Sequence, residues 1–134
     1  IRKFEEIGTH PAAPRLAIAE ALAFHNGIGA ARKEARLRYL ARYWMKRFVG
    51  MPKVRLNTPL DDAHSCVVAN VQIEGIAPGA LVDHLFKDHR ILTTPIVHEE
   101  FQGVRVTPSL YTTLPELDRF ANLLEGIVKK GIPA

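Results

Sequence analysis

The stretch from Gly103 to Gly131 constrains the fold of this chain more than any other. Alternating apolar positions predict a short strand over 103–107, and apolar residues then recur at helical spacing after 113. Thr113 and Glu116 stand three residues apart, the pattern of a capping box, and predict where that helix begins. A helix with one apolar stripe packs against a single surface. The stripe consists of Leu117, Phe120, Ala121, Leu124, Ile127 and Val128.

The segments before this stretch supply that surface. Short strands are predicted at 54–56, 66–74 and 90–97. A helix is predicted from Pro78 to about Lys87, and its inward positions are Leu81, Val82, Leu85 and Phe86. Few strands, with helices covering one face, indicate an α+β domain with a small antiparallel or mixed sheet.

The first half of the chain is predicted to be largely helical. Residues 1–13 read as extended or loop, and a helix follows over Pro14–His25, ended by the segment 26–29. That helix is apolar nearly all round, so it needs burial on several sides, which a 134-residue domain hardly provides. We therefore expect a larger partner body. We also expect residues 1–29 to form a connecting segment and helix, and residues 30–134 to form the small α+β domain.

A second helix, predicted over 30–49, is strongly basic. The segment 30–50 carries seven basic residues against one acid, Glu34. A basic amphipathic helix can bind nucleic acid or an anionic surface. The ordinary alternative is that these charges form the solvated face of a packed helix. No known nucleic-acid-binding motif accompanies the basic helix. The basic residues are Arg32, Lys33, Arg36, Arg38, Arg42, Lys46 and Arg47.

Composition and spacing argue against several functional classes. No apolar run approaches the roughly 18–20 residues that span a membrane. There is no glycine-rich phosphate loop, and the scattered histidines lack metal-ligand spacing. The single cysteine, Cys66, cannot form an internal disulfide, which fits a reducing compartment such as the cytoplasm, and we expect it to be a small buried side chain. The chain begins with Ile1 rather than Met, so we expect either a processed or truncated product or one piece of a longer chain.

Two short stretches suggest chemistry. The first is Phe4–Pro11, which contains Gly8 and Thr9. In the second, Gly103–Phe120, alternation places Arg105 on the strand face opposite Val104 and Val106. An arginine so placed can form a two-pronged hydrogen bond to a carboxylate, or it can be a plain surface residue.

Together these stretches resemble class V aminotransferase-like proteins. The second is similar to their C-terminal signature: an arginine in a short strand, Ser109, a turn reading Tyr111-Thr112-Thr113, then a helix opening with Glu116 and Asp118-Arg119. The first resembles the family's Glu-x-Gly-Thr segment, which a small-residue helix follows. The order of elements is similar along essentially the whole chain, and the nearest subgroup is the isopenicillin N epimerase-like one, related to cysteine desulfurases.

The resemblance implies a cofactor, pyridoxal 5'-phosphate, bound as a Schiff base to a lysine of a large domain. It implies that Arg105 holds the α-carboxylate of an amino-acid substrate. It also implies that Thr9, beside Gly8, contacts the cofactor phosphate of the other subunit of a homodimer. His98, in the loop before Arg105, is a further substrate-binding candidate. The fold implied is the C-terminal domain of a fold type I enzyme with transferase, isomerase or lyase activity.

The sequence departs from the family in two ways. The family lysine lies upstream of the Gly-Thr segment, and Lys3 has the wrong context for it. We therefore expect no catalytic residue in this chain, which would be inactive alone. Cysteine desulfurases carry a cysteine in the loop before the arginine, but residues 92–102 contain none, and Cys66 is 39 residues away. Transamination, epimerisation and elimination remain open.

A second class of function also remains open. In this class the chain is a stand-alone binding module, either a small α+β ligand-binding domain or a basic protein that binds nucleic acid through the helix at 30–49. No membrane partner is expected in either case.

Overall fold

The computed structural model describes Gly8 and residues 11–133, and the chain divides into two compact units, 1–33 and 34–134. The first unit contains helix α2 (Ala12–Ile28) and the start of helix α3 (Ala30–Met45). α2 is longer than predicted at both ends. Pro14 is tolerated because it lies in the first turn, where backbone N–H groups have no helical partner anyway. The helix ends at Gly29 (φ 85°), whose N–H donates to the His25 carbonyl.

No residue of α2 is buried. Leu16 is 71% exposed, and Ile18, Leu22 and Phe24 are each more than half exposed. The described residues of its unit therefore leave this apolar helix unburied, as the sequence predicted.

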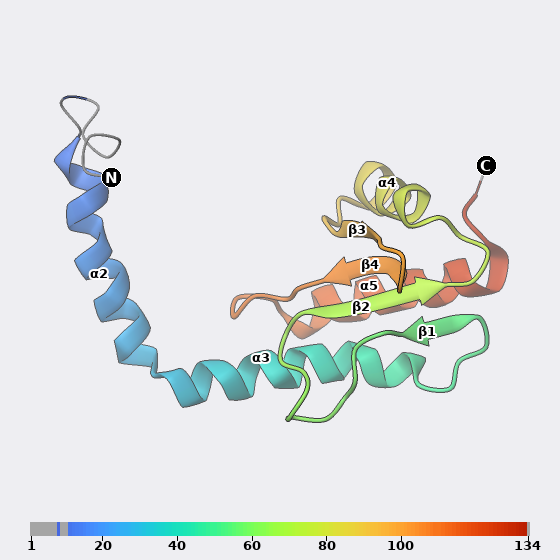
Figure 1. The fold of residues 1–134 in the computed structure, drawn as a ribbon, viewed down its shortest axis with the longest axis horizontal. Helices are drawn as coiled ribbons and strands as arrows, with labels where there is room; N and C mark the ends of the chain where they lie inside the picture. The colour runs from blue at the N-terminus through green and yellow to red at the C-terminus, as the bar shows by residue number, and fades with distance from the viewer. Residues whose placement is uncertain (1–7, 9–10, 134) are drawn as a thin grey trace. The chain divides into compact units, whose positions relative to one another are not determined.

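The second unit is built on a four-stranded sheet with strand order β1-β2-β4-β3 (Figure 1). Every neighbouring pair is antiparallel, so the fold class is α+β and the antiparallel alternative is confirmed. The strands are β1 (Val54–Leu56), β2 (Ala69–Ile73), β3 (Thr94–Val97) and β4 (Gln102–Val106). Residues Asn57–Val68, Glu74–Thr93 and His98–Phe101 connect them, and the middle connection contains helix α4 (Pro78–His89).

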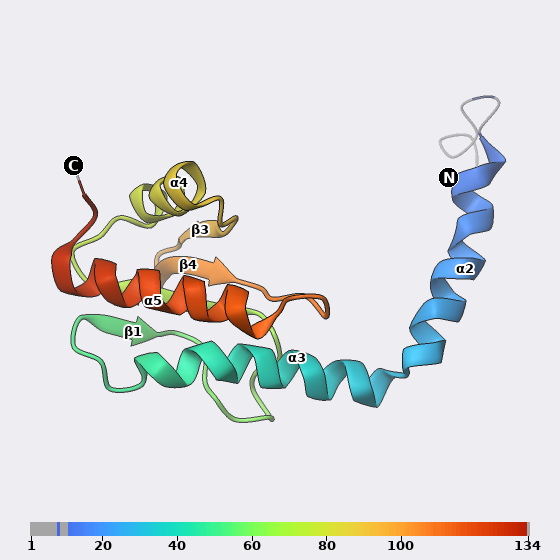
Figure 2. The ribbon, with the colours of Figure 1, turned by 180° about the vertical axis from the view of Figure 1, so that it is seen from behind.

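The core lies on one face of this sheet. Val71 of β2 is opposite Val104 of β4, and both are fully buried. Helices α3 and α5 (Leu114–Lys130) meet through Trp44 and Phe120, whose ring centroids are 5.4 Å apart. Seen from opposite sides, α5 lies behind the sheet in Figure 1 and in front of it in Figure 2. The remaining helical core residues include Leu40, Phe48, Leu81, Leu85, Leu117 and Leu124.

Helix α5 follows the sequence prediction closely. Both capping-box bonds are present: the Glu116 N–H donates to Thr113 Oγ1 (3.4 Å), and the Thr113 N–H donates to Glu116 Oε2 (2.7 Å). The Thr113 N–H bond, and then the bond that the Thr113 hydroxyl donates to Glu116 Oε2 (2.8 Å), lower the pKa of the Glu116 carboxyl, because they favour its charged form. Of the predicted stripe, all but the half-buried Val128 are buried.

Other boundaries differ from the prediction. β2 begins at Ala69 rather than Cys66, because Asp61 holds the preceding residues in a turn: its Oδ1 accepts from the N–H groups of Ala63 and His64. Cys66 therefore lies in a connection and is exposed, so its predicted burial was wrong.

β3 begins at Thr94 because the preceding residues finish α4. Arg90 adopts a left-handed conformation (φ 56°) and its N–H donates to the Phe86 carbonyl. Phe86 is 47% exposed, so its predicted inward position was wrong. The helix predicted over 30–49 changes at Met45 into one 3-10 turn, Lys46–Phe48.

Candidate functional site

Arg105 lies on the face of the sheet opposite the core. It alternates along β4 with the buried Val104 and Val106, so its side chain points away from the helices. Its register partners are Asn70 on β2 and Thr94 on β3. Arg105 Nη2 donates to Thr94 Oγ1 at 3.3 Å. This is the strand geometry that the sequence predicted for Arg105.

An open hollow of about 460 Å³ surrounds the Arg105 side chain on this face. Its size falls within the range of ligand pockets, which runs from about 300 to 1,000 Å³. Apolar side chains (Val68, Ile96 and Phe101) line it together with two cations, Arg55 and Arg105, and one acid, Glu100. The hollow is therefore suited in size and charge to a small anionic molecule.

A pair of asparagines forms the floor of the hollow. Asn70 is only 8% exposed, and its Oδ1 accepts a hydrogen bond from Asn57 Nδ2 (2.7 Å). Asn57 Nδ2 also donates to the Gln102 carbonyl (2.9 Å), while the Asn70 N–H donates to Thr58 Oγ1 (2.9 Å). Asn70 Nδ2 is buried and has no acceptor in the described part of the chain. A buried donor without an acceptor costs free energy, and an acceptor that reached Asn70 Nδ2 would remove this cost.

Gly103 allows this floor to form. Its φ is 147°, a conformation that side-chain-bearing residues rarely adopt. A Cβ at this position would lie 2.4 Å from Asn70 Oδ1 and 2.6 Å from the Val71 carbonyl oxygen. Only glycine lets β4 approach the amide of Asn70 so closely. The sequence interpretation missed Arg55, Asn57 and Asn70; the one signal was a polar residue, Asn70, at an outward position of a strand.

Of the other predicted site residues, His98 belongs to the same unit as the hollow and does not line it. His98 lies on the turn between β3 and β4, where its Nδ1 accepts from the Glu100 N–H (3.2 Å) and its ring lies 5.4 Å from that of Phe101. Gly8 is exposed with φ 119°, and Thr9 lies outside the described residues. The binding roles of Arg105, His98, Gly8 and Thr9 all stay predictions.

The described lysines do not suit a cofactor bound at this hollow, since none of them lines it. Lys33 Nζ contacts His25 Nδ1 at 3.3 Å. Lys87 pairs with Asp83, which raises the pKa of that lysine. The described residues therefore do not fit a Schiff-base cofactor, and Lys3 lies outside them.

The described residues lack two further features. No cluster of three or more His, Cys, Asp or Glu side chains is placed to hold a metal ion there. No helix in the same part of the chain is long and apolar enough to cross a membrane.

The rest of the C-terminal motif has a different place. Arg119 Nη2 donates to the His89 carbonyl (2.9 Å), which ties α5 to the end of α4. Arg119 lines a second hollow of about 280 Å³ that also includes Arg90 and Glu116, while Arg105 belongs to the first. Arg119 therefore has a structural contact beside the second hollow, and Arg105 lines the first.

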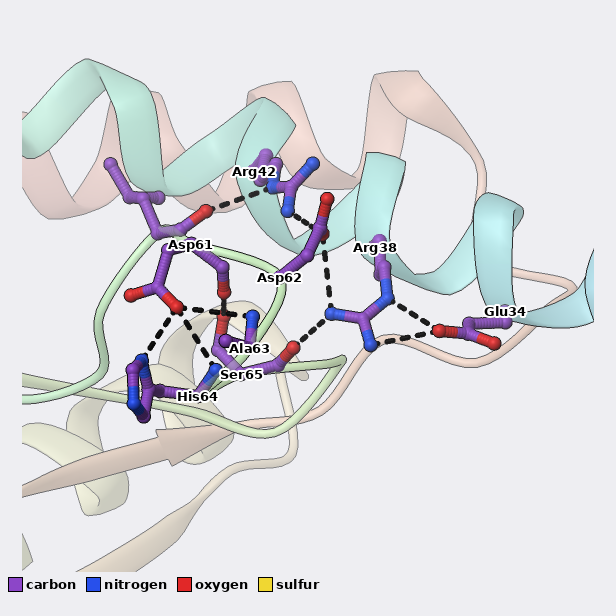
Figure 3. Close-up of polar contacts among 9 residues, drawn as sticks. Glu34, Arg38, Arg42, Asp61, Asp62, Ala63, His64 and Ser65 are labelled. Atoms are coloured by element: carbon purple, nitrogen blue, oxygen red, sulfur yellow. Dashed lines mark hydrogen bonds and ion pairs between the residues drawn. The ribbon is translucent and has the colours of Figure 1, made fainter.

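The basic helix α3 is bound to its surroundings by its charges. Arg38 pairs with Glu34 (2.8 Å) and with Asp62 (3.3 Å), and it donates to the Ser65 carbonyl (Figure 3). Arg42 pairs with the same Asp62 and donates to the Leu60 carbonyl. These contacts hold the β1–β2 connection against α3.

The C-terminal end of α3 and the 3-10 turn that follows it pair with α5. Arg47 contacts Glu125 at 2.7 Å and Asn122 at 2.5 Å. The Tyr43 hydroxyl donates to Asp118, and this bond raises the pKa of the tyrosine. The helix is packed and Arg38, Arg42 and Arg47 stay partly exposed, but their charges are already paired with acids.

Comparison with known proteins finds a likeness in structure alone. No family model matches this sequence, and no curated protein matches it. A solved structure does match: the apo structure of a cysteine desulfurase from Thermococcus onnurineus NA1, with a TM-score of 0.79 and 21% sequence identity. The match covers 92% of this chain and 33% of that chain. The two proteins share a fold, and this chain spans a third of the neighbour's length.

Proposed function

We propose that this chain is the C-terminal part of a pyridoxal-phosphate-dependent enzyme of the class V aminotransferase type, in which Arg105 holds the α-carboxylate of an amino-acid substrate. The observation that carries the proposal is the placement of Arg105 on the uncovered sheet face, inside a hollow of ligand size. The fold shared with a cysteine desulfurase supports it.

The guanidinium of Arg105 has the chemistry for this task. Its planar fork carries five N–H donors, and two parallel ones match the two oxygens of a carboxylate. One Nη bonds to Thr94, which orients the group and leaves other donors for a ligand. In the described part of the chain no ion pair with an acid neutralises Arg105, so its charge is available to a substrate carboxylate. Arg105 would bind and orient the substrate.

The reacting centre would come from elsewhere in the enzyme. The cofactor withdraws electrons from the substrate when it is bound through a lysine, and the described residues offer no lysine beside Arg105. We propose a large domain that supplies it, in a homodimer whose second subunit receives a phosphate contact from Gly8 and Thr9. The exposed apolar side chains of α2 support such an arrangement, because they lack a packing surface within their own unit.

The reaction proposed is transamination, epimerisation or elimination rather than desulfuration. The turn between β3 and β4 carries no cysteine, and Cys66 does not line the hollow around Arg105. The subgroup that fits these residues is the isopenicillin N epimerase-like one.

The test is steady-state kinetics on an enzyme that contains this chain joined to the lysine-bearing domain. Arg105→Ala should lower kcat/KM on the order of 100-fold, since a charge-assisted two-pronged contact is lost. Arg32→Ala, which removes the same charge outside the hollow, is the matched control and should leave kcat/KM unchanged. An unchanged kcat/KM in Arg105→Ala would remove the substrate-binding assignment.

The 134-residue chain provides a second check. Incubated with pyridoxal 5'-phosphate, it should show no internal-aldimine absorbance. A stoichiometric adduct trapped by borohydride would contradict the claim that the reactive lysine lies outside this chain.

A further inference from the structure

The hollow contains a second arginine, Arg55, which the proposed carboxylate contact does not use. Arg55 is exposed at the centre of β1, between the half-buried Val54 and Leu56, and its register partner is Gln72. Those neighbours face the core, so alternation places Arg55 on the same open face as Arg105. Both arginines line the hollow.

Sheet geometry gives the separation of the two arginines. β1 and β4 lie on either side of β2, so two strand spacings separate them. The register partners, Gln72 and Asn70, stand two residues apart along β2. These offsets put the two Cα atoms roughly 12 Å apart. Two long, flexible side chains at that distance can hold opposite ends of one small molecule.

Charge matching sets these arginines apart from those of α3. Arg38, Arg42 and Arg47 each pair with an Asp or Glu of the chain. No ion pair to an acid is formed by Arg55 or Arg105 within the described residues. Glu100 is the one acid that lines the hollow, so two positive charges face one negative charge there. The surplus favours a ligand that brings anionic groups.

The floor between the two arginines also offers a donor. Asn70 Nδ2 has no acceptor in the described part of the chain, because Asn57 already uses the other end of this amide. The nitrogen is covered by its neighbours, so contact with a ligand would require one of them to move. An acceptor oxygen that reached it would remove the cost of a buried, unmatched donor.

We propose that the hollow selects amino acids that carry a second anionic group at the end of the side chain. Arg105 takes the α-carboxylate, Arg55 takes the distal carboxylate or phosphate, and the apolar residues Val68, Ile96 and Phe101 line the space that the intervening carbons occupy. This inference rests on the proposed role of Arg105 and adds the substrate class to it.

The test compares ligands that differ by one charge. L-glutamate and L-glutamine, and O-phospho-L-serine and L-serine, are titrated into the ¹⁵N-labelled 134-residue chain, and side-chain signals of Arg55, Arg105 and Asn70 are followed. The anionic member of each pair should bind about tenfold tighter, the size of one charge-assisted hydrogen bond. Equal affinities within both pairs would overturn the inference. A preference in one pair alone identifies the distal group as carboxylate or as phosphate.

Variants separate this inference from the proposed function. Arg55→Gln should reduce glutamate binding to the level of glutamine and leave glutamine binding unchanged. Lys46→Gln, which removes an exposed charge outside the hollow, is the control and should change neither. An unchanged glutamate preference in Arg55→Gln would overturn the role of Arg55 while Arg105 kept its own. If no ligand moved the Arg105 signal, both the proposed function and this inference would fail.

Discussion

The two faces of the sheet differ in whether the described chain supplies packing and bonding partners for their side chains. On the core face, Val71 and Val104 are fully buried against helices, and the neighbouring residues are apolar. On the open face, Asn70 holds a buried donor without an acceptor in the described chain, and Arg105 has no acid to pair with there. One face therefore stabilises the fold, and the other has polar groups placed for a molecule from outside.

The arginines of the chain show the same division. Arg38 and Arg42 on α3 both pair with Asp62, and these ion pairs hold the β1–β2 connection against the helix (Figure 3). Arg55 and Arg105 lie on short strands, and neither forms an ion pair with an acid of the described residues. Residue type alone does not distinguish the two groups, but position in the fold does.

The largest expected effect concerns the core face. Leu124→Ala removes a side chain that is 0% exposed and should lower the free energy of unfolding by about 3 kcal/mol, because lost burial and a cavity add together. Leu92→Ala makes the same change at a side chain that is 82% exposed and should alter stability by less than about 0.5 kcal/mol. Urea unfolding measures both. Equal effects would mean that the helix-covered core is misplaced.

A smaller effect on stability is expected at Gly103, where β4 approaches Asn70 of the open face closely. Gly103→Ala should lower the free energy of unfolding by about 2 kcal/mol, since its Cβ would collide with Asn70 and Val71. The same change at Gly126, inside α5 with nothing within 4 Å, should raise stability by up to about 1 kcal/mol. Opposite signs in the unfolding midpoints support the close approach of Asn70, and a neutral Gly103→Ala would refute it.

A third prediction concerns the helix that carries much of the core. Thr113→Ala removes the N-cap of α5 and should cost about 1 kcal/mol in urea unfolding. Thr107→Ala, at an exposed threonine outside the capping box, should change stability little. A neutral Thr113→Ala would show that the capping box adds no stability.

The capping box also gives a pH dependence. Because folding lowers the pKa of Glu116, its contribution is complete above the ordinary value of 4.5 and is lost as pH falls through the folded value. Glu116→Gln, which removes the titrating carboxyl, should therefore flatten this part of the acid-unfolding profile. Thr113→Ala should flatten it only in part, because it removes the hydroxyl bond and keeps the backbone N–H that lowers the pKa of Glu116 most. A profile unchanged by Glu116→Gln would contradict the assignment of this pH dependence to the carboxyl of Glu116.

Sequence patterns predicted an element correctly where the signals for it lie within that element. The capping box and single stripe placed α5 correctly because both signals lie within one helix. α2 has the same length as α5, 17 residues, yet none of its residues is buried. Its all-round apolar surface correctly indicated a missing packing surface. Strand starts were predicted less well, because the turn at Asp61 and the left-handed conformation of Arg90 lie ahead of the observed strands and the apolar pattern does not reveal them.

The candidate site was predictable only in part. Alternation along β4 indicated the face of Arg105, which the structure confirms. Arg55 and Asn70 join Arg105 through strand pairing across β1, β2 and β4, and no local pattern reveals that pairing. The matched charges of α3 were hidden for the same reason, since Arg47 and Glu125 are 78 residues apart.

The central claim is that the open face binds a carboxylate through Arg105, and a ¹⁵N titration with L-alanine and L-alaninamide tests it most directly. The two molecules share an amino group and a side chain and differ in the carboxylate. The account predicts that alanine shifts the Arg105 Nε–H signal, that alaninamide does not, and that Arg105→Gln abolishes binding. Equal shifts with both molecules, or undiminished alanine binding in Arg105→Gln, would contradict it.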